Sequence, residues 1–299
     1  MLRELLLCGL FLILVAFSDT MASSISSSIS RRRMNFVKTP QVEEGKDRMN
    51  IGTIEVSSIG IGTLGWSAIA RKESIGNLVE LAQEKGCDFF DTAERYGASK
   101  EKEAFGGDWG GAERLLSVCS QSSLRPIKVA TKVRLVLFDI QAYEILQCPS
   151  AHSSAQFLQF TPSPFRMDAQ SVVEACEASR KRLGVESIDL YQIHMPDIIQ
   201  PFMTPWKIRN VKDELYWEGL IECYKRGIVK NVGVSNYGKT LLLRAHEKLS
   251  RVNVPLAANQ INYSLLYRTK AGAQDTVDIG KEMGVQTLGS MPLGIFQCR

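Results

Sequence analysis

Three stretches decide the fold, and they read Cys87-Asp-Phe-Phe-Asp-Thr-Ala-Glu-Arg-Tyr96, Ile127-Lys-Val-Ala-Thr-Lys132 and Ile188-Asp-Leu-Tyr-Gln-Ile-His194. Each contains a short apolar run typical of a buried β-strand, followed at once by side chains that can carry chemistry. These side chains are a carboxylate, a phenol, an amine and an imidazole, from Asp91, Tyr96, Lys132 and His194. In a parallel barrel, the carboxyl ends of the strands surround the active site. We therefore expect the four side chains to meet at one rim.

The segments around these stretches repeat one pattern, in which a helical segment ends at a glycine and an apolar strand follows. The four steps of this kind are Gly86-Cys87, Gly184-Val185, Gly227-Ile228 and Gly284-Val285. A glycine just past a helix adopts the left-handed conformation that other residues resist. Helices that lead repeatedly into short strands indicate βα units and a parallel sheet.

The pattern predicts a short hairpin within residues 50–56 and a series of parallel strands after it. These strands are expected near residues 59–62, 87–91, 127–132, 188–194, 229–234, 257–262 and 286–291. A closed barrel of this kind has eight βα units and takes about 250 residues, nearly all of a chain of this length. The predicted fold class is therefore α/β, a (β/α)8 TIM barrel that is incomplete, with about seven βα units present.

Composition excludes several functional classes. The formal net charge is +4, and basic and acidic residues are interleaved, so we expect no nucleic-acid partner. The seven cysteines are odd in number, which argues against a closed disulfide framework, and they include no C-x-x-C pair, so no zinc site is indicated. The histidines are His152, His194 and His246, without ligand spacing, so a metal-dependent lyase or hydrolase is disfavoured and no metal is expected.

The first 45 residues are expected to be a targeting or disordered N-terminal extension, and two signals compete within them. The apolar run Leu5–Phe17 has the length of a secretory h-region and is shorter than the ~20 residues that span a bilayer. From Met21, serines and Arg31-Arg-Arg33 follow, and no acidic residue occurs between Asp19 and Glu43, as in an organelle transit peptide. A secretory leader, a transit peptide starting at Met21 and a disordered tail all stay open, and no stable membrane insertion is expected.

The remainder, residues 46–299, resembles the aldo-keto reductase superfamily, and within it the plant plastid oxidoreductases. The matching motifs are Asp-Thr-Ala-Glu-Arg-Tyr-Gly at 91–97, Ile-Asp-Leu-Tyr-Gln-Ile-His at 188–194, Val-Gly-Val-Ser-Asn-Tyr at 232–237 and Asn-Gln-Ile-Asn-Tyr-Ser-Leu-Leu at 259–266. The likeness runs from about Ile51 to Leu293 and is interrupted by an atypical insert at about 133–167. This resemblance implies a chloroplast protein, with the secretory pathway and the cytoplasm as alternatives.

The resemblance also implies roles for the four rim residues. Tyr96 would donate a proton to the oxygen of a substrate carbonyl, while Lys132 lowers its pKa and Asp91 holds Lys132. His194 would orient or polarise the carbonyl. A free phenol has a pKa of about 10 and needs a neighbouring ammonium to act near neutrality. Hydride must come from a cofactor, because no side chain supplies it, and the family implies NADP(H).

Further residues are implied as cofactor contacts. By resemblance, the nicotinamide carboxamide would be bound by Ser235, Asn236 and Gln260, and the nicotinamide ring would lie near the first loop and the end of the seventh strand, at Gly62, Thr63, Pro292 and Leu293. Ser290 stands where the family has an aromatic residue that stacks on nicotinamide. The family's contacts to the adenosine 2'-phosphate follow the eighth strand, so preference for NADP over NAD stays open.

Two functions from different classes follow from these observations. The first is an NADP(H)-dependent oxidoreductase that reduces a small aldehyde or ketone to an alcohol, with Tyr96 as general acid. The second is a non-catalytic truncated or regulatory protein that retains the four rim residues but cannot hold the cofactor. The identity of the substrate and the oligomeric state leave no readable pattern in the sequence.

Overall fold

The structure is a computed structural model, and it describes residues 48–64, 66, 72–97, 110–121, 123, 125–133, 168–196, 211–265 and 272–292. The expected N-terminal extension and Leu293 lie outside these residues. So does the expected insert at 133–167, except for Val133, which is the last residue of a strand.

The chain begins its described part with the predicted hairpin and continues into one parallel sheet. Strands β1 (Arg48–Ile51) and β2 (Ile54–Ser57) pair antiparallel. The seven strands of the parallel sheet are β3 (Gly60–Gly62), β4 (Phe89–Asp91), β5 (Lys128–Val133), β6 (Leu190–Ile193), β7 (Val232–Ser235), β8 (Leu256–Asn262) and β9 (Gln286–Ser290). They pair in chain order, so each predicted βα step adds one neighbouring strand.

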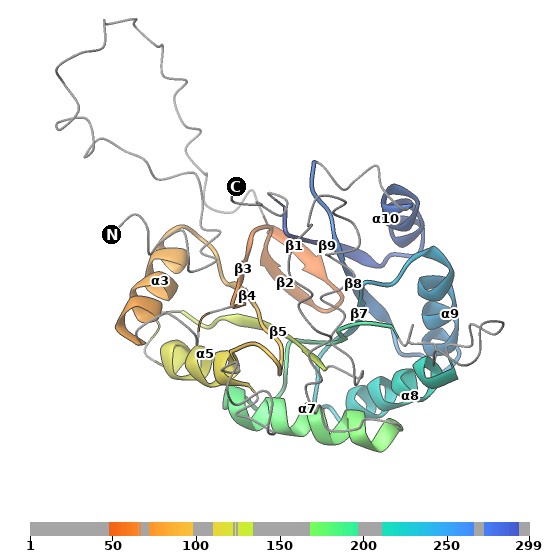
Figure 1. The fold of residues 1–299 in the computed structure, drawn as a ribbon, viewed down its shortest axis with the longest axis horizontal. Helices are drawn as coiled ribbons and strands as arrows, with labels where there is room; N and C mark the ends of the chain where they lie inside the picture. The colour runs from red at the N-terminus through yellow and green to blue at the C-terminus, as the bar shows by residue number, and fades with distance from the viewer. Residues whose placement is uncertain are drawn as a thin grey trace, which may run out of the picture.

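Helices follow most strands and lie outside the curled sheet (Figure 1). In the described residues they are α3 (Lys72–Glu84), α5 (Gly111–Gln121), α7 (Ala169–Leu183), α8 (Val211–Lys225), α9 (Lys239–Ser250) and α10 (Ala273–Glu282). Strands that curl inside a layer of helices, each joined to the next through a helix, have the arrangement of a TIM barrel. The predicted fold class is confirmed, with seven parallel strands in the described part of the chain.

The predicted left-handed glycines are confirmed as well. Gly86, Gly184, Gly227 and Gly284 all have positive φ angles, between 67° and 79°. At Gly184 the backbone N–H donates to the carbonyls of Arg180 and Lys181 and so ends α7. The chain can then turn back toward β6.

The side chains of each strand point alternately into the interior of the curled sheet and toward the helix layer. On β6, Leu190 packs with the hairpin cluster inside, whereas Tyr191 and Ile193 belong to the larger core beneath the helices. On β5, Ala130 faces inward and Val129 outward. Because successive side chains of a strand point to opposite faces, the odd and even positions of one strand serve different layers.

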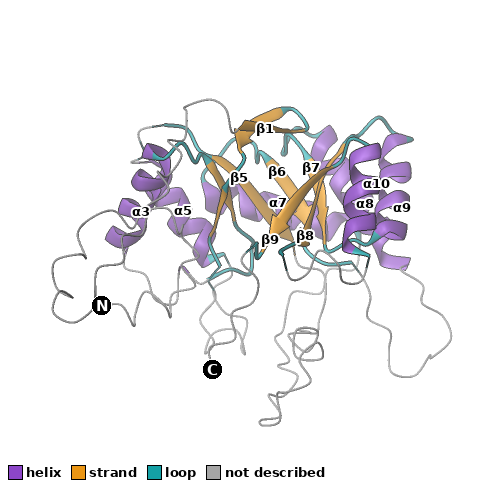
Figure 2. Cartoon of the chain, turned by 90° about the horizontal axis from the view of Figure 1, so that it is seen from above, coloured by secondary structure: helices purple, strands orange, loops and turns teal. Residues whose placement is uncertain are grey.

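The β1–β2 hairpin covers the amino ends of the strands (Figure 2). Its residues Ile51, Ile54 and Val56 are buried against Phe89 and Leu190 of the sheet. The hairpin therefore leaves the carboxyl ends of the strands uncovered. Within the described ranges, none of the helices combines the length and apolar character needed to cross a membrane.

Candidate active site

Lys132 and Asp91 form the centre of the site at the carboxyl ends of β5 and β4. Lys132 Nζ donates to both carboxylate oxygens of Asp91, each at 2.7 Å, and to the carbonyl of Thr92 at 2.9 Å. The Lys132 side chain is almost fully buried, while Asp91 retains a little exposure. A buried ammonium with charge-assisted bonds to a carboxylate has one strongly preferred position.

Electrostatics keep Lys132 charged despite its burial. Desolvation on its own would lower the pKa of this ammonium. The negative charges of Asp91 and of a Tyr96 phenolate, together with hydrogen bonds to both side chains, outweigh that effect and raise the pKa of Lys132. A cation is therefore retained beside the Tyr96 hydroxyl throughout the ordinary pH range.

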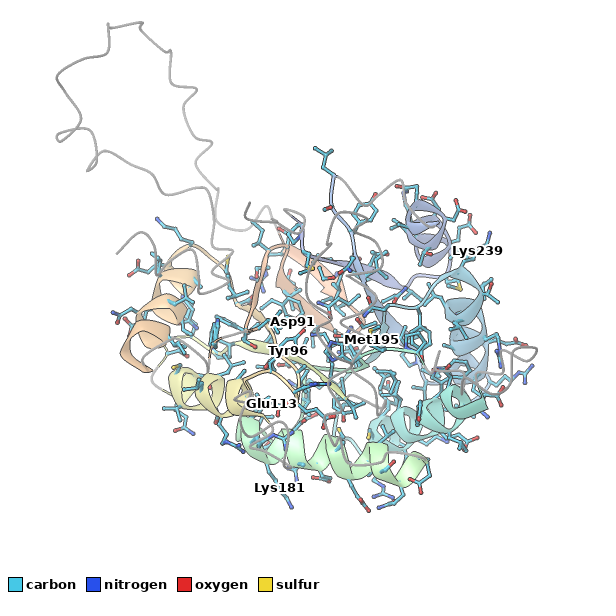
Figure 3. All side chains as sticks on the ribbon, viewed as in Figure 1. Asp91, Tyr96, Glu113, Lys181, Met195 and Lys239 are labelled. Carbon is cyan, nitrogen blue, oxygen red and sulfur yellow. The ribbon has the colours of Figure 1, made fainter. Side chains whose placement is uncertain are left out.

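Tyr96 and His194 complete the group that the strand-end rule predicts. The two rings meet edge to face, with centroids 5.7 Å apart, and Lys132 Nζ lies 5.2 Å from the centroid of the Tyr96 ring. The backbone N–H of His194 donates to the carbonyl of Val133 at 3.0 Å, which ties the end of β6 to that of β5. The structure thus brings all four predicted rim residues together, and Figure 3 shows Asp91 and Tyr96 inside the ring of helices.

Three of the predicted cofactor contacts form a connected group beside these four. Gln260 Nε2 donates to Asp91 Oδ2 at 3.1 Å, and Ser235 Oγ donates to the Gln260 carbonyl at 2.9 Å. The Asn236 side-chain amide donates to the carbonyl of His194 at 3.0 Å and lies 3.0 Å from the sulfur of Met195. Asn236 has a left-handed φ of 62°, a conformation that asparagine tolerates better than most residues.

Unpartnered polar atoms at this end fit a bound carboxamide. Within the described residues, Gln260 Oε1 and Thr63 Oγ1 are buried side-chain atoms without a hydrogen-bond partner. Buried polar atoms are normally paired, so such atoms at a rim indicate a place for a ligand. Gly62 is exposed, and a Cβ built on it would meet nothing within 4 Å, so the backbone there is open to close approach.

The end of the seventh parallel strand lies at the same edge of the sheet. Ser290 Oγ donates to Asn262 Oδ1 at 2.8 Å across β9 and β8, and Pro292 follows two residues later on the surface. The expected contact from Leu293 lies outside the described residues. No group of three or more potential metal ligands occurs in the described part of the chain.

Glu113 is a buried charged residue near this site that the sequence did not single out. It lies in the first turn of α5, is fully buried, and bonds Thr131 of β5. The sequence signal for it is weak, because glutamate in the first turn of a helix is ordinarily a solvated residue. Its burial depends on an arginine 69 positions away.

The chain is similar to several named proteins over most of its length. It is 27% identical to the chloroplastic pyridoxal reductase of Arabidopsis thaliana over 83% of this chain and 60% of that protein. It is 28% identical to probable aldo-keto reductase 1 of Glycine max, over 82% of this chain and 59% of that protein. The chain therefore spans about 60% of the length of these relatives.

Solved structures show the same fold. A thermostable aldo-keto reductase in complex with the inhibitor epalrestat matches with a TM-score of 0.57 and 21% identity, over 82% of this chain and 73% of that one. An aldo/keto reductase from Brucella melitensis matches with a TM-score of 0.53 and 20% identity, over 81% and 71% of the two chains. The model of the Aldo/keto reductase family matches residues 58–295. The chain belongs to the aldo/keto reductase family.

Proposed function

We propose that this protein is an NADP(H)-dependent oxidoreductase that reduces a small aldehyde or ketone to an alcohol. The observation that carries the proposal is the buried Lys132 ammonium, which donates to both carboxylate oxygens of Asp91 and lies 5.2 Å from the centroid of the Tyr96 ring. This arrangement suits proton transfer to a developing alkoxide. The family to which the chain belongs consists of oxidoreductases that act on small carbonyl compounds.

Tyr96 is the proposed general acid. A phenol releases its proton more readily when a cation stabilises the phenolate, and Lys132 is the cation beside it. Asp91 holds Lys132 in place, and the Gln260 amide in turn binds Asp91. His194, edge to face with Tyr96, is placed to orient the carbonyl oxygen toward the phenol.

The bound nicotinamide cofactor supplies the hydride that the carbonyl carbon receives. Gln260 and Thr63 offer unpartnered buried oxygens to its carboxamide, and Ser235 and Asn236 lie beside them. Gly62, Pro292 and Leu293 are proposed as further contacts to the cofactor. The choice of NADP(H) over NAD(H) follows the resemblance described above.

A pyridine aldehyde is the first substrate to test, because one relative is named a pyridoxal reductase. That relative is also named chloroplastic, and this chain carries a serine-rich, arginine-containing segment between Met21 and Glu43. We therefore propose a plastid location. Import of a fluorescent fusion into isolated chloroplasts, with and without residues 1–45, checks it.

The direct test combines cofactor binding with turnover. NADPH fluorescence is titrated with purified protein, and oxidation of NADPH is followed with a panel of aldehydes and ketones. Tyr96→Phe is expected to retain NADPH binding and to lose about 100-fold or more of the turnover, the usual contribution of a positioned general acid. Tyr224→Phe, which removes a phenol from the partly buried face of α8, is the matched control and should retain activity.

Two outcomes contradict the proposal. A folded protein that binds no NADPH would favour the non-catalytic alternative. Equal turnover in wild type and Tyr96→Phe would remove Tyr96 from the role of general acid, even if NADPH binds.

A further inference from the structure

The start of α5 contacts the chain segments of both Tyr96 and Lys132. The backbone N–H of Ala112 donates to the carbonyl of Tyr96 at 3.0 Å. The next residue, Glu113, accepts a hydrogen bond from Thr131 Oγ at 2.6 Å, and Thr131 immediately precedes Lys132 on β5. Two adjacent residues of one helix therefore connect the proposed acid to the cation that activates it.

The Glu113 carboxylate is fixed on both of its oxygens. Oε1 accepts from Thr131, and Oε2 accepts from Arg182 Nε of α7 at 2.5 Å. Arg182 in turn donates to Ser179 Oγ at 2.9 Å, and burial together with the positive charge of Arg182 lowers the pKa of nearby Arg114. Glu113 is fully buried and Arg182 is only slightly exposed. The carboxylate therefore has a single arrangement between α5, α7 and β5.

Gly110 makes the close approach of these side chains possible. A Cβ built on Gly110 would collide with the side chains of both Arg182 and Glu113, and Gly110 has a φ of 77°. The turn before α5 therefore has the one residue type that fits against the ion pair. Figure 3 shows Glu113 at the end of α5 that lies above α7.

Strand β5 connects the Glu113–Thr131 hydrogen bond to the candidate active site, because Thr131 and Lys132 lie on its two faces. Thr131 points toward the helix layer, whereas Lys132 points inward to Asp91 and Tyr96. Neighbouring residues of a strand share one stretch of rigid backbone, so a shift of Thr131 moves Lys132 as well. Neighbouring helix–strand contacts in this core are made by apolar side chains such as Leu116 and Val129. A buried ion pair adds little stability over such apolar contacts. Stability therefore does not explain why the Glu113–Arg182 pair lies against the strand that carries Lys132.

We propose that Glu113, held by Arg182, is a positioning residue that fixes the distance between the Tyr96 hydroxyl and the Lys132 ammonium. It does so through Thr131 on one side and the Ala112–Tyr96 backbone bond on the other. The inference rests on the proposed function, because it assigns Glu113 a role in setting the acidity of Tyr96.

The test measures the ionisation of Tyr96 without cofactor or substrate. Ultraviolet absorbance of phenolate is followed against pH in each variant and in the same variant carrying Tyr96→Phe, and the difference isolates Tyr96. Thr131→Val removes the hydroxyl and retains the shape. It is expected to raise the titration midpoint of Tyr96 by about half a pH unit or more, since a looser Lys132 contact stabilises phenolate less.

Two controls separate positioning from general stability. Thr131→Ser restores the hydroxyl and should return the midpoint to that of wild type. Val129 lies on the same face of β5, and Val129→Ala loosens the core while retaining Thr131 and Arg182 as the partners of Glu113. It should lower the urea midpoint of unfolding and leave the Tyr96 midpoint unchanged. An equal shift in Val129→Ala would overturn the proposal.

A second variant covers the case in which Thr131→Val does not fold. Glu113→Gln keeps an oxygen for Thr131 but loses the charge that holds Arg182, so a smaller shift in the same direction is expected. A folded Glu113→Gln or Thr131→Val protein with the wild-type midpoint contradicts the inference. Because the titration requires no turnover, an inactive wild type would count against the proposed function and would leave this test decisive for Glu113.

Discussion

The amino and carboxyl ends of the parallel strands differ in how they treat polar groups. At the amino ends, the β1–β2 hairpin buries apolar side chains, and Asn231 accepts from the backbone of Thr53 at 2.9 Å. At the carboxyl ends, a buried ammonium lies among polar side chains, and oxygens of Gln260 and Thr63 lack partners within the described residues. In the first arrangement the Asn231 oxygen has a partner within the protein, whereas in the second the oxygens of Gln260 and Thr63 are left to bind a ligand at some expense of stability.

Lys132→Met should produce the largest effect. Lys132 is the fully buried cation among the proposed site residues at the carboxyl ends of the strands, and the substitution removes its charge. Removing one member of a buried pair costs about 3–5 kcal/mol, and the slight exposure of Asp91 places the expected loss near the lower value. Turnover should fall about 100-fold or more, since Tyr96 loses its cation. Urea unfolding and NADPH oxidation measure the two losses.

The double variant Lys132→Met/Asp91→Asn sharpens this result. Neutralising Asp91 removes the uncompensated charge, so part of the stability should return while turnover stays low. If both return together, the stability and the function of this end are not separate properties.

Gly52→Ala tests the amino end and should destabilise the protein without changing cofactor binding. Gly52 has a φ of 57°, and a Cβ there would collide with the Asn231 side chain and meet Ala257 at 3.0 Å. We expect a loss of about 2–4 kcal/mol, from the left-handed backbone and from the disturbed Thr53–Asn231 bond. Gly227→Ala is the matched control, since its φ is 70° but a Cβ there meets nothing within 4 Å, and it should cost about 1–2 kcal/mol.

The next largest effect is expected from the same substitution, threonine to valine, made once at each end of the parallel strands. Thr63→Val removes a buried hydroxyl oxygen that has no partner in the described residues, so stability should stay equal or rise by about 1 kcal/mol. NADPH affinity should fall about fivefold, which corresponds to one lost hydrogen bond of about 1 kcal/mol. Thr53→Val removes a hydroxyl bonded to Asn231 at 3.2 Å and should reverse both results, with lower stability and unchanged affinity. Identical behaviour of the two variants would break the comparison.

Asp88 gives the smallest expected effect, through pH. Burial on its own would raise the pKa of this carboxyl, but hydrogen bonds from Arg48 and Ser57 and the Arg48 charge lower it. A lowered folded pKa means that the stabilisation is present above the unfolded value of about 3.9 and is lost as pH falls through the folded value. The difference in unfolding free energy between wild type and Asp88→Asn should therefore shrink below about pH 4. Urea titrations at several pH values measure it, and a difference that is constant with pH would contradict the assignment.

Local patterns in the sequence predicted most of the fold. Short, mostly apolar segments marked the strands of three to seven residues, and glycines marked the helix ends, because strand burial and left-handed backbone are local properties. The expectation that Asp91, Tyr96, Lys132 and His194 lie together followed from one rule about strand ends. The group could therefore be predicted even though its members lie up to 103 positions apart in the sequence.

Long-range pairing of polar residues could not be predicted in the same way. Glu113 reads as a solvated residue of an amphipathic helix until Arg182 and Thr131 are placed against it. Asn231 lies within a predicted strand, and nothing in its local sequence indicates that Thr53, 178 positions away, docks on it. No local period encodes such contacts.

By itself, then, the sequence determined the order of strands and helices and which chemical groups lie at each strand end, since both depend on neighbouring residues and on the period of burial. Only the tertiary structure decided which charges are buried in pairs, which oxygens are left without partners, and that the start of α5 reaches both Tyr96 and Lys132. The physical reason is that the burial of a polar group depends on what packs against it, and in this fold the packing partners are distant in the chain.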